Sequence, residues 1–218
     1  MTDVAVIVPM LGRPHTIGPL VDSIISTTPS ARIVFGCSPA DTVVIDRLDQ
    51  LGLEHFTVPG PNRGDYARKI NTGFRLTSEP LIFTGACDLR FHAGWFDAAI
   101  AELAPGIGVV GTNDLGSSRV MAGLHATHSL VTRDYVEWFG TIDQPGLVMH
   151  EGYLHEFVDD ELVQTAMSRN AWAFAADSHV EHLHPAWGKA DSDDLYDQTP
   201  FRMRMGRKLY RQRQQLWT

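Results

Sequence analysis

Short apolar runs alternate with helix-like segments through the first half of the chain, and this order constrains the fold more than any other feature. Val4–Val8 is an uninterrupted apolar run, typical of a strand that is covered on both faces. Later strand-like runs span 31–36, 54–58 and 81–84, and helix-like segments span 17–25, 40–51 and 65–75. Because strands that alternate with helices form parallel sheets, this order predicts an α/β fold with a mostly parallel sheet flanked by helices.

The second half of the chain is less regular. Its patterns predict helices at 94–103, 132–139, 157–169 and 201–217, and short strands at 108–112, 124–131, 172–175 and 178–182. The polar, aspartate-rich stretch from Trp187 to Thr199 is typical of a surface loop. We therefore expect one domain with two halves, about 1–112 and about 113–200, the second smaller and mixed, followed by a basic C-terminal helix at 201–218.

Charge is distributed unevenly along the 218 residues, whose net charge is −8. The stretch 200–218 contains six basic residues and no acidic one, so the rest of the chain has 12 basic residues against 26 acidic ones. An acidic body argues against nucleic acid as a partner. The basic tail has two interpretations. It is either a solvated helix that covers the acidic body, or a contact for an anionic membrane surface or an acidic acceptor.

Cellular location is predicted from the cysteines and the N-terminus. Cys37 and Cys87 each lie in or beside a strand-like run, which fits a reduced protein better than a disulfide scaffold. The N-terminal apolar run is too short for a signal peptide and lacks a basic start. Since no stretch reaches the roughly 18–20 apolar residues of a membrane span, we expect a soluble, cytoplasmic protein.

One acidic residue and two histidines stand where chemistry is expected. Asp88 follows the apolar run 81–84, and the carboxyl ends of parallel strands are where open α/β sheets bind ligands. Strand alternation places the imidazoles of His182 and His184 on the same face. A carboxylate and an imidazole suit a divalent ion such as Mn²⁺. The alternatives are a helix cap or ion pair for Asp88, and hydrogen-bonded structural roles for the histidines.

Four stretches, taken in order, resemble a known family. They are Val6–Pro9 with Arg13–Pro14, Asn62–Gly64 with Ala67 and Asn71, Phe83–Trp95, and Glu156–Glu161 with His182–Pro185. The chain resembles GT-A-fold glycosyltransferases of the family 2 type, including the short ones of phages and actinobacteria. The resemblance implies a GT-A-like fold, with the first half binding the nucleotide sugar and the second half binding the acceptor.

The resemblance also implies an activity. It implies metal-dependent transfer of a hexose from a UDP- or GDP-sugar to a hydroxyl on a protein, glycan or lipid, with inversion. Asp88 with His184, or with His182, would hold Mn²⁺ or Mg²⁺, which stabilises charge on the departing diphosphate. The donor-binding candidates are Pro9, Arg13, Arg63, Asp65, Lys69 and Cys87. Asp65 and Lys69 are also spaced to form a simple surface ion pair.

The acidic group at 159–161 supplies the candidate general base, because the attacking hydroxyl must lose a proton. The resemblance makes one of these residues the base, and we favour Asp160 over Asp159 and Glu161. The alternative is that these carboxylates only stabilise a helix N-terminus.

Two departures from the family pattern leave other functions open. Of the usual acidic motif, Gly85-Ala86-Cys87-Asp88 keeps only the last acid, and Cys37-Ser38 follows the second strand where an aspartate often contacts the base. Backbone groups or Asp41 would then recognise the base. The missing acid favours a non-catalytic nucleotide- or sugar-binding module as one rival. A nucleotidyltransferase is the other, although the loop 10–14 is poor in the glycine that such enzymes use.

Overall fold

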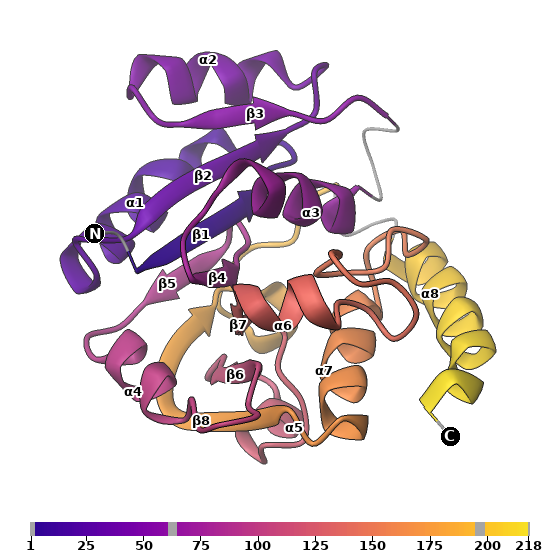
Figure 1. Cartoon of the computed structure of the whole chain (residues 1–218). Helices are drawn as coiled ribbons and strands as arrows, with labels where there is room; N and C mark the ends of the chain where they lie inside the picture. Colours follow the sequence, from indigo (N-terminus) through magenta and orange to yellow (C-terminus); the bar gives the residue numbers. More distant parts are fainter. Residues whose placement is uncertain (1–2, 61–64, 195–198, 218) are drawn as a thin grey trace.

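The computed structural model describes residues 3–60, 65–194 and 199–217. In these ranges the strands form one eight-stranded sheet in the order β3-β2-β1-β4-β7-β6-β8-β5 (Figure 1). The strands are β1 (Val4–Pro9), β2 (Arg32–Cys37), β3 (His55–Thr57), β4 (Leu81–Thr84), β5 (Leu89–Phe91), β6 (Val109–Asn113), β7 (Ser129–Thr132) and β8 (Trp172–His182).

The first half has the parallel arrangement that the sequence predicts. Strand β1 pairs in parallel with β2 and β4, and β2 pairs in parallel with β3. The connecting helices are α1 (Ile17–Thr27), α2 (Thr42–Gln50) and α3 (Tyr66–Leu76), each within two residues of the expected bounds. The prediction of an α/β sheet flanked by helices is confirmed.

Two apolar cores cover the two faces of β1, because successive side chains of a strand point to opposite sides. Val4, Val6 and Val8 pack with α1, α2 and α4 (Trp95–Ala101) in one core. Ala5 and Ile7 pack with α3, α6 (Arg133–Trp138) and α7 (Val158–Ser168) in the other. Burial on both faces explains the continuous apolar run of β1.

The second half is mixed, as expected, but several of its elements differ from the prediction. Strands β7 and β5 are antiparallel to their neighbours, whereas β8 runs parallel to β6. The two short strands predicted at 172–175 and 178–182 are one strand, β8, and the strand predicted at 124–131 is confined to β7. Strand β5 and the short helix α5 (Ser118–Met121) were not predicted.

The pairing of the long strand β8 with β6 contains a register shift. Its register on β6 jumps from Thr112 opposite Ala175 to Asn113 opposite His179. Three residues, 176–178, therefore lie between the partners of two adjacent β6 residues. One of them, Ser178, is buried and donates a 2.7 Å hydrogen bond to the Trp95 carbonyl.

The C-terminal helix α8 (Thr199–Arg213) continues into the 3-10 turn η4 (Gln214–Trp217) and lies beside α7 (Figure 1). Arg213 fixes it there, because its guanidinium donates to Glu161 and Asp143 at 2.7 Å each. Gly206 lies so close to the Glu156 carbonyl that a Cβ would clash with it. In the described ranges, no helix has the length and apolar character needed to cross a membrane.

Candidate functional site

A cavity of about 390 Å³ opens at the carboxyl ends of β1 and β4. The ends of these strands, the N-termini of α3, α7 and α8, and the end of β8 all contribute to its wall. Its lining includes Pro9, Arg13, Asp65, Lys69, Cys87, Asp88, Asp159, His182 and His184, which were all singled out from the sequence. Arg63, the remaining donor-binding candidate, lies outside the described residues.

Strand pairing brings Asp88 and His182 together, although 94 positions separate them. Strand β5 pairs with β8 so that Leu89 lies opposite His182, and the Leu183 amide donates to the Asp88 carbonyl at 2.8 Å. The Asp88 carboxylate then lies 3.4 Å from Nε2 of His182. Nη1 of Arg13 lies 3.3 Å from the same carboxylate.

These neighbours keep Asp88 ionised. Burial alone would raise the pKa of the carboxyl. The hydrogen bond from His182, together with the charges of His182, His128 and Arg13, outweighs burial and holds that pKa well below its usual range. An ionised carboxylate in a polar cavity is the form that binds a cation.

The donor set at Asp88 fits a divalent ion. A carboxylate oxygen and an imidazole nitrogen 3.4 Å apart are close enough to be ligands of one ion, since each bond would be about 2.0–2.2 Å long. The other ring nitrogen of His182, Nδ1, is buried and has no hydrogen-bond partner among the described residues. Oxygen and nitrogen donors of this kind suit Mn²⁺, and the carboxylate also suits Mg²⁺.

His184 lies close by, but its ring has a different hydrogen bond. Its Nδ1 accepts from the Ala186 amide at 3.1 Å, so in the neutral ring Nε2 carries the proton. The rings of His182 and His184 are 5.1 Å apart, and Trp187 packs against both. Trp187 therefore anchors the start of the polar loop on the two histidines.

Arg13 connects the metal-capable residues to that polar loop. It donates to both carboxylate oxygens of Asp193, with Nε at 2.6 Å and Nη2 at 2.9 Å, while Nη1 faces Asp88. The backbone of Arg13 is left-handed, with φ of 59°. The sequence did not identify Asp193, because a loop carboxylate among several others carries no signal of its own.

Asp65 and Lys69 form an ion pair, as the sequence allowed, but the pair is buried and not at the surface. Lys69 Nζ lies 3.0 Å from Asp65, and it donates to the Met10 carbonyl at 2.7 Å and the Ser38 hydroxyl at 2.9 Å. Asp65 precedes α3 without capping it, since its side chain accepts from Ser38 at 3.0 Å. This network joins the ends of β1 and β2 to α3.

Other residues at the donor end also have defined partners. The Asp41 carboxylate accepts a hydrogen bond from the Gly12 amide at 2.5 Å and so holds the loop after β1. Burial, followed by the charge of Asp88, raises the pKa of the Cys87 thiol to about 12. Cys37 and Cys87 are both free.

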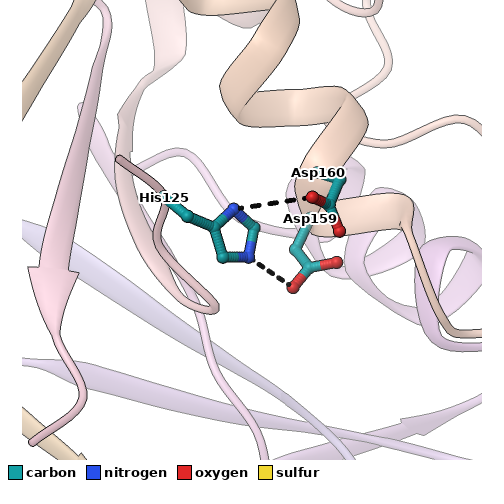
Figure 2. A group of neighbouring side chains, drawn as sticks. All are labelled: His125, Asp159 and Asp160. Carbon is teal, nitrogen blue, oxygen red and sulfur yellow. Dashed lines mark hydrogen bonds and ion pairs between the residues drawn. The ribbon is translucent and has the colours of Figure 1, made fainter. Parts of the chain in front are cut away.

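The three acids at the start of α7 have different environments. Asp159 lines the cavity and lies 3.2 Å from Nε2 of His125. Asp160 lies 2.6 Å from Arg119 and 4.0 Å from Nδ1 of His125, so His125 stands between the two carboxylates (Figure 2). Glu161 is buried under α8, where it accepts from Tyr153 and Arg213 at 2.7 Å each.

The group His125, Asp159 and Asp160 could itself hold a metal ion, because one ligand atom from each lies within 4.8 Å of the others. Positive charge is already present there. Burial lowers the pKa of His125, but the hydrogen bond and charge of Asp159 raise it by more, so the net shift favours the imidazolium. The same hydrogen bond lowers the pKa of Asp159 against the effect of burial. With Arg119 also present, this cluster balances its own charge.

Several cavity residues were not identified from the sequence. Among them are Thr127, His155, Glu156, Thr199, Arg202 and Met203. Three of them belong to the first turns of α8. The position of a terminal helix on the body depends on tertiary contacts. The hydrophobic periodicity of the sequence predicts the helix but not these contacts.

No protein-family model matches the chain, and no curated protein matches its sequence. Solved structures match it by shape. The mannosyltransferase PcManGT from Pyrobaculum calidifontis, in complex with GDP-Man and Mn²⁺, aligns with a TM-score of 0.64 at 13% identity, covering 97% of this chain and 74% of that one. Glucosyl-3-phosphoglycerate synthase from Mycobacterium tuberculosis, with Mn²⁺, UDP and glucosyl-3-phosphoglycerate, aligns with a TM-score of 0.63 at 14% identity, covering 96% and 79%.

A third match is S. aureus TarS 1-349 in complex with UDP, with a TM-score of 0.60 at 13% identity, covering 82% of this chain and 59% of that one. Identities this low establish the architecture and no more. The GT-A-like fold expected from the sequence is therefore confirmed, and this chain has the GT-A fold found in these glycosyltransferases.

Proposed function

We propose that this chain is a metal-dependent glycosyltransferase that moves a sugar from a nucleoside diphosphate sugar to a hydroxyl acceptor. One observation carries the proposal. A single cavity of about 390 Å³ is lined by a metal-capable pair, Asp88 with His182, and by a separate carboxylate, Asp159. In group transfer from a sugar diphosphate, a metal stabilises the departing diphosphate and a carboxylate accepts the proton of the attacking hydroxyl. The GT-A fold, and the GDP-Man and UDP in structures of similar fold, support this assignment.

Asp88 and His182 are the residues we assign to hold Mn²⁺ or Mg²⁺. We place His182 ahead of His184 because its Nε2 faces Asp88, whereas Nε2 of His184 is protonated when Nδ1 accepts from Ala186. A divalent ion bound here would stabilise the negative charge that builds on the departing diphosphate. Arg13, beside Asp88, adds a second positive charge on the donor side.

Asp159 is the residue we assign as general base, in place of the Asp160 that the sequence favours. Asp159 lines the cavity, whereas Asp160 is paired with Arg119. His125 orients the Asp159 carboxylate and keeps it ionised, so that it can accept the proton of the attacking hydroxyl. Inversion by in-line displacement follows if Asp159 acts on the face of the sugar opposite the diphosphate.

The test is donor turnover and nucleotide binding with a panel of UDP-, GDP- and dTDP-sugars, each with Mn²⁺, Mg²⁺ or EDTA. We expect one donor to be hydrolysed with metal and not with EDTA. Asp88→Asn should lower that rate on the order of 100-fold, the usual cost of losing one group that stabilises a transition state. Asp97→Asn, an exposed acid on α4, is the matched control and should leave the rate unchanged.

The products separate the proposal from its rivals. Release of a nucleoside diphosphate from the sugar nucleotide supports the transferase. A nucleotidyltransferase would instead release pyrophosphate when it is given a nucleoside triphosphate and a sugar 1-phosphate, so that substrate pair is assayed alongside the panel. If no donor binds, with or without metal, the sugar-nucleotide assignment is wrong.

A non-catalytic binding module is the second candidate, and the residues after β4 favour it. Ala86, which lines the cavity, stands where the family pattern has its first acid, so one contact to the sugar or ribose is missing. Such a module would bind one nucleotide sugar tightly but would not turn it over with any hydroxyl acceptor, and Asp88→Asn would affect only binding.

A further inference from the structure

Helix α8 has two chemically different faces. The inner face packs on the body through Gly206, which is buried, and through the half-buried Leu209 and Tyr210. The outer face carries four exposed cations. These are Arg204, Arg207, Lys208 and Arg211, and together with Pro200, Met203 and Gln212 they line a shallow groove along the helix.

The basic residues of α8 are divided in the same way by their partners. Arg213 on the inner face has two carboxylate partners, Glu161 and Asp143, and Arg202 lies 3.7 Å from Glu156. Within the part of the chain that the structure describes, none of the four outer cations has a carboxylate at ion-pairing distance. The inner cations are therefore neutralised by carboxylates of the body. Of the outer four, Arg207 also lies 5.9 Å from the centre of the Phe157 ring, but none is neutralised by a carboxylate in the described ranges.

The outer face is also electrostatically unfavourable for the isolated helix. Arg204 and Lys208 are four residues apart, as are Arg207 and Arg211, and like charges at this spacing repel on a helix surface. A solvated helix face normally alternates acids with bases at this spacing, yet residues 200–218 contain no acid. An external anionic surface would relieve this repulsion.

Exposed apolar side chains lie beside the outer cations. Phe201 is 50% exposed and Met205, one turn later, is 39% exposed. The Arg204 guanidinium lies 5.5 Å from the Phe201 ring centre, so the cation and the ring share one surface. Cations interleaved with exposed apolar groups are typical of helices that lie in the interface of a lipid bilayer.

From this pattern we infer that the outer face of α8 docks on an anionic phospholipid membrane. The four cations would face lipid headgroups, and Phe201 and Met205 would insert between them. A nucleic acid fits less well, because the body of the chain has 12 basic against 26 acidic residues and would repel an extended polyanion. A lipid surface needs to meet only the one helix.

Docking on this face has a consequence for the cavity, which rests on the proposed function. Thr199, Arg202 and Met203 of the same helix line the catalytic cavity. A membrane held against the outer face of α8 would therefore lie close to the α8 side of that cavity. The acceptor would then be a hydroxyl at the membrane surface, on a lipid headgroup or a lipid-linked glycan.

The experiment is co-sedimentation of the full chain with phosphatidylcholine vesicles that either contain or lack phosphatidylserine, over a series of salt concentrations. We expect binding only with phosphatidylserine, weakening as salt rises. Arg204→Gln/Lys208→Gln should weaken binding about 25-fold, since each cation near an anionic surface contributes roughly a fivefold factor in affinity. Phe201→Ser should weaken binding at every salt concentration.

The control is Arg47→Gln/Arg75→Gln, which removes two exposed cations from α2 and α3 and should leave vesicle binding unchanged. Equal binding to both kinds of vesicle, or equal loss in the control and the α8 variants, would overturn the inference. Tighter binding to RNA than to anionic vesicles at the same salt would also overturn it.

Two further readouts keep this inference separate from the proposed function. Hydrolysis of a soluble donor should be unchanged in Arg204→Gln/Lys208→Gln, whereas vesicle binding should be unchanged in Asp88→Asn. Vesicle binding without turnover of any donor would support the proposed docking surface and contradict the proposed glycosyltransferase activity.

Discussion

The buried ion pair of Lys69 and Asp65 gives the sharpest test of what these residues do. Both were candidates for donor contacts, yet Lys69 is only 1% exposed and Asp65 5%. The Lys69 ammonium has three partners, which are Asp65, the Ser38 hydroxyl and the Met10 carbonyl. We therefore expect Lys69→Met to act first on stability, because it leaves the Asp65 carboxylate buried without its counter-charge.

The size of the effect follows from burial. Removing one partner of a buried ion pair costs about 3–5 kcal/mol of unfolding free energy. In a domain of this size each kcal/mol lowers the melting temperature by about 2–4 °C. Lys69→Met should therefore melt roughly 6–20 °C below the wild type. Methionine has a similar volume, so little of the loss would come from a cavity.

Urea and thermal unfolding would measure this loss. Lys208→Met, which removes an exposed lysine from α8, is the matched control and should change the melting temperature little. In the double variant Asp65→Asn/Lys69→Met neither member of this pair is charged, so part of the lost stability should return. If Lys69→Met instead melts like the wild type and loses affinity for the donor, Lys69 is a donor contact and the structural role is refuted.

Four further predictions concern variants of the loop, of His125 beside the proposed base, and of α8. Asp193→Asn removes the carboxylate that holds Arg13, and donor affinity should rise by up to about fivefold in a titration, whereas an unchanged affinity would show that the loop does not compete. His125→Gln should move the acid limb of the activity profile to higher pH, because Asp159 loses the hydrogen bond that lowers its pKa. Since the pKa of His125 itself is raised, its stabilising contribution is present below about pH 6.5 and is lost as pH rises through the higher folded value. The stability cost of His125→Gln should thus be larger at pH 6 than at pH 9, and a cost independent of pH would contradict this. Gly206→Ala should destabilise the protein by about 1–3 kcal/mol in urea, because the added methyl meets the Glu156 carbonyl, whereas Gly18→Ala has open space and should not destabilise it.

The parallel half of the sheet could be predicted because its signals are local. A strand buried on both faces, such as β1, appears as an unbroken apolar run, and each following helix has its own period. Strand β5 has three residues, too few to show a period, and its existence depends on pairing with β8. The sequence predicts two strands in place of β8 because Ala176 and Asp177, in its middle, are exposed and so do not continue the pattern of a buried strand.

Parts of the candidate site could be predicted where the residue type alone indicates the chemistry, as for a carboxylate or an imidazole that can bind a metal. Asp88 and the two late histidines were expected to meet, and the structure brings all three to one cavity. The choice between Asp159 and Asp160 was not predictable. Neighbouring helical residues point about 100° apart, and the rotation of α7 depends on the left-handed Phe157 that precedes it, with φ of 72°. The partner of Arg13 is Asp193, 180 positions away in the sequence, and no local pattern predicts so distant a contact.

The irregularity in β8 limits how this protein can change length. Because an odd number of residues, three, lies between adjacent β6 partners, the side chains of β8 exchange faces relative to β6 across this point. Deleting one residue at 176–178 would place Leu183, and inserting one would place Glu181, where His182 now faces the Asp88 carboxylate. Deleting two residues would place His184 there, whereas inserting two would place Val180. Among these length variants, only the loss of two residues should therefore keep an imidazole opposite Asp88.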